Sequence, residues 1–388
     1  MIEDTFARYF PDLVAIRHDI HAHPEMLFEE FRTSGIVAAE LQRLGFRVTT
    51  GVAKTGVVGT ISNGTSSRTI GIRADMDGLP IDERTNLSYA SRYPGKMHAC
   101  GHDGHTVMLL GLARYLAEMR RFDGTVHLIF QPSEEDEGGA LRMIEDGLFT
   151  RFPCDRVFAL HNLPGEPEGQ ILVRPGPITA CCDVLTIVVE GVGGHGGLPQ
   201  KSVDPVVAAA NIVTALQTVV SRNVDPLDPV VLTVGAINGG SMATVIPGSV
   251  RMLVGLRTMT EPVRDMVISR IREIITLQAR SFGCSAAIDA GQDSWSYPAG
   301  CNSIAEAALV REVALEMGQD ADKVDIRGPF MFSEDFSFMQ QVVPSCYFGL
   351  GAGKGPMLHD PAYDFNDALL LKGPGFWARL VEKALPQA

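Results

Sequence analysis

The sequence lacks the features that define several large protein classes. Its longest apolar runs are broken by charge or glycine before the roughly 18 residues that a membrane-spanning helix needs. No basic region followed by an apolar core opens the chain, so no secretory signal is predicted and we expect a cytoplasmic protein without membrane attachment. Runs of five or more lysines and arginines are absent and the net charge is −13, which argues against nucleic acid as a partner.

Motifs of other enzyme classes are missing as well. The chain has no G-x-S-x-G nucleophile elbow and no H-E-x-x-H zinc helix. The glycine-rich segment 349–355 carries Gly355 where a phosphate-binding loop requires serine or threonine. The seven cysteines are scattered and form no C-x-x-C pair, which is typical of buried reduced thiols. A serine hydrolase or a nucleotide enzyme is therefore not expected.

The pattern of apolar residues predicts an α/β protein with an inserted second domain. Helix and strand signals alternate over the first half, as in a sheet covered by helices. In the middle, strands are predicted at residues 184–190, 230–237, 250–256 and 286–290, and helices at 204–219 and 262–280. This β-α-β-β-α-β order is that of a ferredoxin-like α+β domain. We therefore predict one larger α/β domain, residues 1–178 and 292–388, interrupted by an insert at 179–291.

The segment 97–105 carries the strongest chemical signal in the chain. It reads Met-His-Ala-Cys-Gly-His-Asp-Gly-His, so that a cysteine, three histidines and an aspartate share one short loop. Gly101 and Gly104 allow the backbone to fold tightly, and Cys100 and His102 could then direct their donor atoms at one cation or a pair. The alternative is a polar loop whose histidines are incidental.

Three further segments place polar side chains where apolar strands end. The strand before Gln131 runs into four acids within five positions, beginning with Glu134 and Glu135. Open α/β sheets carry their active sites at such strand ends, although a solvated acidic turn is the alternative. His161 ends another apolar strand and His359 lies near the C-terminus. Alone each histidine would be structural, but beside Cys100 and Glu135 both become candidate ligands.

At this point the sequence resembles the M20 metallopeptidase family, and within it the branch of hippurate hydrolases, N-acyl-amino-acid amidohydrolases and auxin-conjugate hydrolases. The matching motifs keep their order over nearly the whole chain and are specific as a set. They lie at residues 21–25, 73–81, 97–105, 130–140, 159–162, 193–195, 239–240, 245–247, 333–336 and 359–367.

The resemblance implies a metal-dependent hydrolase that cleaves the amide bond of N-acyl amino acids. The ligands that it implies for two divalent metal ions, zinc, manganese, nickel or cobalt, are Cys100, His102, Glu135, His161 and His359. Glu134 would be the general base and Asp77 a carboxylate that orients a ligand. The insert would be a lid and dimerisation domain, which makes the chain a homodimer or higher oligomer, and its His195 would stabilise the oxyanion.

The resemblance is less complete for the residues that contact the substrate than for those that carry out the reaction. Thr244 stands before Val-Ile-Pro, where the family usually has a substrate-holding asparagine. Arg257 matches an arginine that pairs with the substrate carboxylate, although a surface arginine on a lid strand is the alternative. Two rival functions remain at this point, a dipeptidase or carboxypeptidase and a catalytically silent relative that binds metal or ligand.

Overall fold

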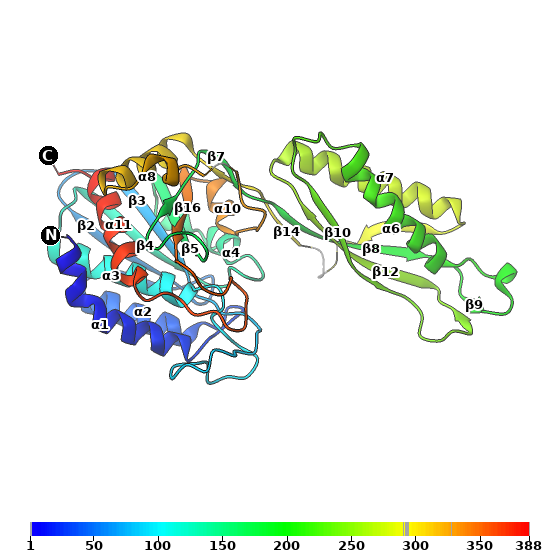
Figure 1. The fold of residues 1–388 in the computed structure, drawn as a ribbon, viewed down its shortest axis with the longest axis horizontal. Helices are drawn as coiled ribbons and strands as arrows, with labels where there is room; N and C mark the ends of the chain where they lie inside the picture. The colour runs from blue at the N-terminus through cyan, green and yellow to red at the C-terminus, as the bar shows by residue number, and fades with distance from the viewer. Residues whose placement is uncertain (1, 290, 292–294, 327, 388) are drawn as a thin grey trace. The chain divides into compact units, whose positions relative to one another are not determined.

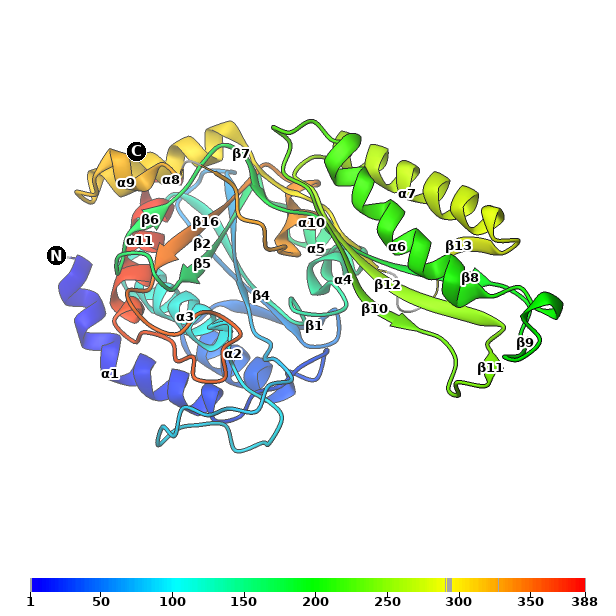
Figure 2. The same cartoon turned by 45° about the vertical axis from the view of Figure 1, so that its right-hand side comes forward.

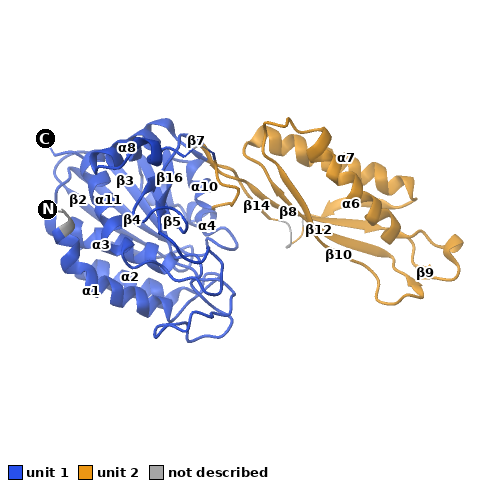
Figure 3. Ribbon diagram, viewed as in Figure 1, with its two compact units in different colours: residues 1–176, 301–328, 335–388 blue, residues 177–300, 329–334 orange. Residues whose placement is uncertain are grey.

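The computed structural model describes residues 2–289, 291, 295–326 and 328–387. They divide into two compact units (Figure 3): unit 1 comprises residues 1–176, 301–328 and 335–388, and unit 2 comprises residues 177–300 and 329–334. The predicted end of the insert, between residues 291 and 292, lies beside residues that are outside the described part of the chain, 290 and 292–294. Ala290, the predicted last residue of the strand at 286–290, is one of these. No helix in the described part of the chain combines the length and apolar character needed to cross a membrane.

Unit 1 is an α/β fold (Figure 1). Its seven-stranded sheet has the order β1-β2-β4-β3-β5-β16-β6. Its strands are β1 (Arg47–Val52), β2 (Gly56–Asn63), β3 (Thr69–Asp75), β4 (Gly124–Gln131), β5 (Arg156–Leu163), β6 (Ile171–Leu172) and β16 (Ser345–Gly351). Strands β4, β3, β5 and β16 run parallel to their neighbours in this series, whereas β1, β2 and β6 pair antiparallel. The predicted α/β sheet is thereby confirmed.

Helices cover the two faces of this sheet. They are α1 (Ile2–His21), α2 (Phe31–Arg43), α3 (His102–Met119), α4 (Gly139–Glu145), α5 (Leu148–Arg151), α8 (Ile304–Glu316), α9 (Ala321–Val324), α10 (Phe336–Gln340) and α11 (Leu369–Ala384). Alternate residues of β4, such as Leu128 and Phe130, belong to one buried core with α1, α2, α3 and α11. On the other face, α4 packs against β4, and α10 packs against β5 and β16.

Unit 2 has the predicted β-α-β-β-α-β order. Its elements in this series are β8 (Cys182–Glu190), α6 (Pro205–Arg222), β10 (Val231–Asn238), β12 (Ser249–Arg257), α7 (Glu261–Ser281) and β13 (Ser285–Asp289). The sheet has the order β10-β12-β8-β13, and β14 (Trp295–Tyr297) also pairs with β8. Helices α6 and α7 lie together against this sheet (Figure 2), where alternate strand residues such as Met252 and Val254 form a second core.

The remaining elements are short. They are β7 (Gly176–Thr179), β15 (Gly300–Asn302), β9 (Gly194–His195), β11 (Val245–Ile246) and the 3₁₀ helix η1 (Pro199–Lys201). Strand β11 pairs antiparallel with β9, and these two strands are called the β9–β11 arm of unit 2.

Candidate functional site

Three neighbouring parallel strands of unit 1 bring four predicted site residues to one edge of the sheet. Asp77 follows β3, Glu134 and Glu135 follow β4, and His161 lies near the end of β5. Because the strand order is β4-β3-β5, the carboxyl ends of these strands lie side by side. This is the edge at which open α/β sheets build their active sites.

The loop that carries Cys100 turns into α3 at Gly101, where a side chain would be both strained and crowded. Gly101 has φ +93°, and a Cβ atom there would lie 2.4 Å from Asn162 Oδ1. One turn into the helix, a Cβ atom on Gly104 would lie 2.3 Å from the Phe365 ring. Both positions therefore favour glycine, and His102 begins α3 directly after Gly101.

The backbone is strained at two positions of the site. His359 has φ +65° and its N–H donates to Ala99 O at 2.8 Å, which ties the C-terminal loop to the residue before Cys100. Ser133, which precedes Glu134, has φ +51°. Non-glycine residues in this conformation cost about 1–3 kcal/mol each and gather at functional sites.

The five predicted ligands lie in two overlapping groups. Cys100, His102 and His161 offer ligand atoms that are all within 4.8 Å of one another. The same is true of Cys100, Glu135 and His359, so the thiol belongs to both groups. His359 Nε2 lies 3.1 Å from Glu135 Oε1, and the His359 side chain is 51% exposed while the others are largely buried.

Hydrogen bonds donated by the ring Nδ1 atoms leave the Nε2 atoms of two histidines facing these groups. His102 Nδ1 donates to Asp77 Oδ1 at 3.1 Å, and Asp77 Oδ2 accepts the backbone N–H of Glu135 at 3.0 Å. His161 Nδ1 donates to Asn162 O at 2.8 Å. The Nε2 atom of His102 is buried and has no hydrogen-bond partner among the described residues. Such an atom fits a metal ion, because buried polar atoms rarely stay unsatisfied.

The charges of the site favour a cation. Burial, together with Glu135 and Glu134, raises the pKa of the Cys100 thiol well above its usual value, so a thiolate here requires a positive charge beside it. Burial holds the pKa of His161 well below its usual value, which keeps the ring neutral as a ligand must be. The donor set of thiol, imidazole and carboxylate therefore fits a divalent transition metal.

Carboxylates act in the opposite direction on His102. Burial disfavours its charged form, yet Asp75 and Asp77 outweigh that effect and raise the pKa of His102 to about 10. When no metal ion is bound, a proton on the His102 ring offsets the negative charge of the surrounding carboxylates.

The sequence did not single out Asp75 and His105 as part of this site. His105 Nδ1 donates to Asp75 Oδ1 at 2.6 Å, and both side chains lie with His102 in a further group of possible ligand atoms. Arg73 also contacts Asp75, at 2.7 Å from Nη1 to Oδ2. For His105 the available signal was its place in the loop at 97–105. For Asp75 it was the alternation Arg73-Ala74-Asp75-Met76-Asp77, which places three charged side chains on one face of a strand and its extension.

Three predicted residues lie in unit 2, in two separate places. His195 and Thr244 are neighbours in the β9–β11 arm, where the Gly196 N–H donates to Thr244 O at 2.8 Å. Arg257 ends β12, at the far end of that strand from the arm. Its Nη1 atom is buried and has no hydrogen-bond partner among the described residues.

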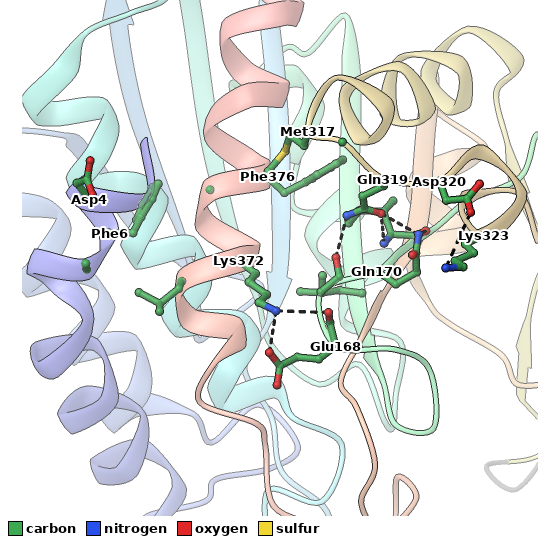
Figure 4. A pocket seen from close by; sticks show the side chains of 17 residues that line it. Asp4, Phe6, Glu168, Gln170, Met317, Gln319, Asp320, Lys323, Lys372 and Phe376 are labelled. Carbon is green, nitrogen blue, oxygen red and sulfur yellow. Dashed lines mark hydrogen bonds and ion pairs between the residues drawn. The ribbon is translucent and has the colours of Figure 1, made fainter. Parts of the chain in front are cut away.

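A cavity of about 730 Å³ lies elsewhere in unit 1, and none of the predicted site residues lines it (Figure 4). The polar side chains on its rim pair with one another. Gln170 Nε2 donates to Gln319 Oε1 at 2.8 Å, and Lys372 Nζ donates to Glu168 Oε1 at 2.7 Å. Convergent ligand atoms, rather than volume, therefore identify the candidate functional site.

Comparison with known proteins gives consistent matches over nearly the whole chain. A family model described as Peptidase family M20/M25/M40 matches residues 71–383. Hippurate hydrolase of Campylobacter jejuni is 39% identical, over 95% of this chain and 96% of its own. N-acetyl-L-cysteine deacetylase of Bacillus subtilis is 36% identical, over 94% and 86%. A dinuclear metal-binding peptidase of the M20 family from Bacillus subtilis superimposes with a TM-score of 0.84 at 29% identity, covering 98% of this chain and 100% of its own.

Proposed function

The chain belongs to peptidase family M20/M25/M40 and is a hydrolase of amide bonds, and from this premise we propose that it cleaves N-acyl amino acids by a metal-dependent reaction. The relatives named hippurate hydrolase and N-acetyl-L-cysteine deacetylase support this substrate class, because both names describe an acylated amino acid. The proposed products are a carboxylic acid and a free amino acid.

The observation that carries the proposal is the convergence of five donor side chains in two groups that share Cys100, with the buried His102 Nε2 atom unpaired. Cys100, His102, Glu135, His161 and His359 would hold two divalent ions, and the dinuclear relative supports that number. Zinc, manganese, nickel and cobalt all suit this mixture of thiolate, imidazole and carboxylate.

Each protein group then has a distinct task. When bound, the two ions supply Lewis acidity, which makes water more acidic and draws electron density from the scissile carbonyl. Glu134 takes the proton of the attacking water and delivers it to the departing amine nitrogen. Asp77 accepts from His102 Nδ1 and from the Glu135 backbone, so that one carboxylate fixes the orientation of two ligands.

His195 is the proposed donor to the oxyanion of the tetrahedral intermediate. Its Nδ1 atom accepts the Gly197 N–H at 2.9 Å, so the neutral ring carries its proton on Nε2. Nε2 can then donate a hydrogen bond to the developing negative oxygen. Thr244, beside His195 in the β9–β11 arm, is the proposed contact to the substrate at the usual asparagine position.

We propose that unit 2 acts as a lid and pairs two subunits. Strand β10 pairs only with β12 among the described residues, so its other edge offers unpaired backbone groups. Val206 and Val207 of α6 are 40% and 47% exposed, and such apolar side chains are suited to an interface.

The seven cysteines are all unpaired, which supports a reducing compartment such as the cytoplasm.

The proposed function predicts that chelated protein is inactive and that one of the four metals restores hydrolysis of benzoylglycine or an N-acetyl amino acid. The measurement is release of the free amino acid, with a dipeptide as the competing substrate. Cys100→Ser should need much more metal for the same rate, because it removes the ligand shared by both groups. Cys301→Ser, at an exposed cysteine of unit 1, is the matched control. Activity that is unaffected by chelation contradicts the proposal.

Arg257 should recognise the substrate carboxylate. A planar guanidinium with a buried, unpaired Nη1 atom suits a carboxylate, which accepts two parallel hydrogen bonds. Arg257→Ala should therefore lower kcat/KM for benzoylglycine roughly 30- to 150-fold, the equivalent of ~2–3 kcal/mol. The amide of benzoylglycine should lose little, because it carries no charge to pair.

Comparing benzoylglycine with its amide distinguishes a loss of carboxylate recognition from a loss of structure in unit 2. Arg251→Ala, on the same face of β12, is the control and should affect both substrates alike. If Arg257→Ala also slows both substrates equally, the arginine supports the structure of unit 2 and Thr244 becomes the residue to examine.

A further inference from the structure

A small pocket opens beside Glu135 in unit 1. Its volume is about 210 Å³, and since a water molecule occupies roughly 30 Å³, it has room for a group several times that size. Its apolar wall is formed by Met26, Leu27, Leu79 and Pro80. The carboxyl-bearing residues Asp77, Glu135 and Asp136 form the rest of the lining together with Gly78.

The loop that provides this wall is held in a strained conformation. Leu27 and Phe28 have φ +55° and +60°, a conformation that costs a non-glycine residue about 1–3 kcal/mol. The Phe28 N–H donates to the buried Glu30 carboxylate at 3.1 Å, and the Gly78 N–H donates to Glu25 O at 2.8 Å. These contacts fix the loop to the end of β3, so the position of Leu27 at the pocket is built into the fold.

Exposure and charge together indicate which chemical group the pocket suits. The Leu27 side chain is 41% exposed to solvent, and a ligand group that covered it would remove apolar surface from water, which is favourable. Asp136 also lines the pocket and is not among the candidate metal ligands, so its carboxylate repels an anion at this place. The pocket therefore suits a neutral, apolar group and excludes the carboxylate end of a substrate.

We propose that this acyl pocket, defined by Met26, Leu27, Leu79 and Pro80, receives the acyl group of the substrate and gives the enzyme its preference for acyl groups larger than acetyl. The inference rests on the proposed function, since an N-acyl amino acid has one neutral apolar end and one anionic end. The anionic end then points away from Asp136. The apolar end covers Leu27, and the scissile amide lies between the two ends beside the ligand groups.

The test compares benzoylglycine with acetylglycine in the metal-loaded full-length enzyme. Leu27→Ala should lower kcat/KM for benzoylglycine about 10-fold, because a lost apolar contact in a binding pocket is typically worth that much or more. Acetylglycine is too small to depend on this wall and should change less than about 2-fold. Met26→Ala is the second variant and should shift the ratio in the same direction.

Phe31→Ala is the matched control, since Phe31 is 59% exposed on α2 and does not line the pocket. It should leave the substrate ratio and the metal content unchanged. Equal effects of Leu27→Ala and Met26→Ala on both substrates, with metal content intact, overturn the acyl pocket alone. If the unaltered enzyme hydrolyses neither substrate with any of the four metals, the proposed function itself fails, and this inference fails with it.

Discussion

Glu134→Gln is expected to reduce kcat by about 10² to 10⁴-fold while the protein keeps its full metal content. The range is that of a missing general base. Glutamine has the same shape, so the contact at 3.4 Å between the Asp335 N–H and Oε1 of residue 134 can persist. The backbone that presents this residue, with Ser133 at φ +51°, is also unaffected. Steady-state kinetics and the metal content per chain are the two measurements.

Glu135→Gln provides the matched control at the adjacent position. Glu135 Oε1 lies 3.1 Å from His359 Nε2 and 3.9 Å from His102 Nε2, in the middle of the candidate ligands. Removing its charge should lower metal affinity as well as turnover, because the amide is a weaker ligand for a transition metal. Identical behaviour of the two variants would mean that their roles are wrongly assigned.

Arg73→Met is expected to cost roughly 3–5 kcal/mol of unfolding free energy. Arg73 is fully buried and contacts three polar side chains, Gln131 at 2.8 Å, Asp75 at 2.7 Å and Asp335 at 3.0 Å. Methionine fills a similar space but leaves two buried carboxylates without their cation, which is the costly half of breaking a buried ion pair. The expected fall in Tm is on the order of 10 °C.

The matched control for Arg73→Met lies at the start of the same strand region. The Arg68 side chain is exposed and, within the described part of the chain, donates only to Ser66 Oγ and to the Pro386 carbonyl oxygen. Arg68→Met should change unfolding free energy by less than about 0.5 kcal/mol. If thermal unfolding gives the same Tm for both variants, the buried cluster of Arg73 is not a major source of stability.

Local sequence patterns predicted most of the strands but not the first and last helices. Both α1 and α11 contain a proline, Pro11 and Pro374, and proline inside a helix normally argues against one. The structure forms them because both pack against α3 and complete the core of unit 1. Such tertiary packing between segments about 100 to 270 residues apart is not visible in a local pattern, and it outweighs propensity.

The same distinction applies to the candidate site. The loop at 97–105 and the acids after β4 are local signals, so Cys100, His102 and Glu134 could be named from sequence. Arg73 and Asp335 are 262 positions apart, and nothing in the chain between them reveals that they meet. A strand pattern also gives no reason to separate Asp75 from Asp77, since both face the same side of β3 and its extension.

The order of the strands has a consequence for synthesis of the chain. Strand β16 lies between β5 and β6, and its partner residues in β5 are made about 190 positions earlier. The main segment of unit 2, residues 177–300, is continuous and leaves the ribosome entirely within that interval. Because domains fold as units while the chain emerges, unit 2 should be folded while the sheet of unit 1 still lacks an inner strand. His359 follows β16, so a nascent chain gains its complete set of candidate ligands only in the last steps of translation.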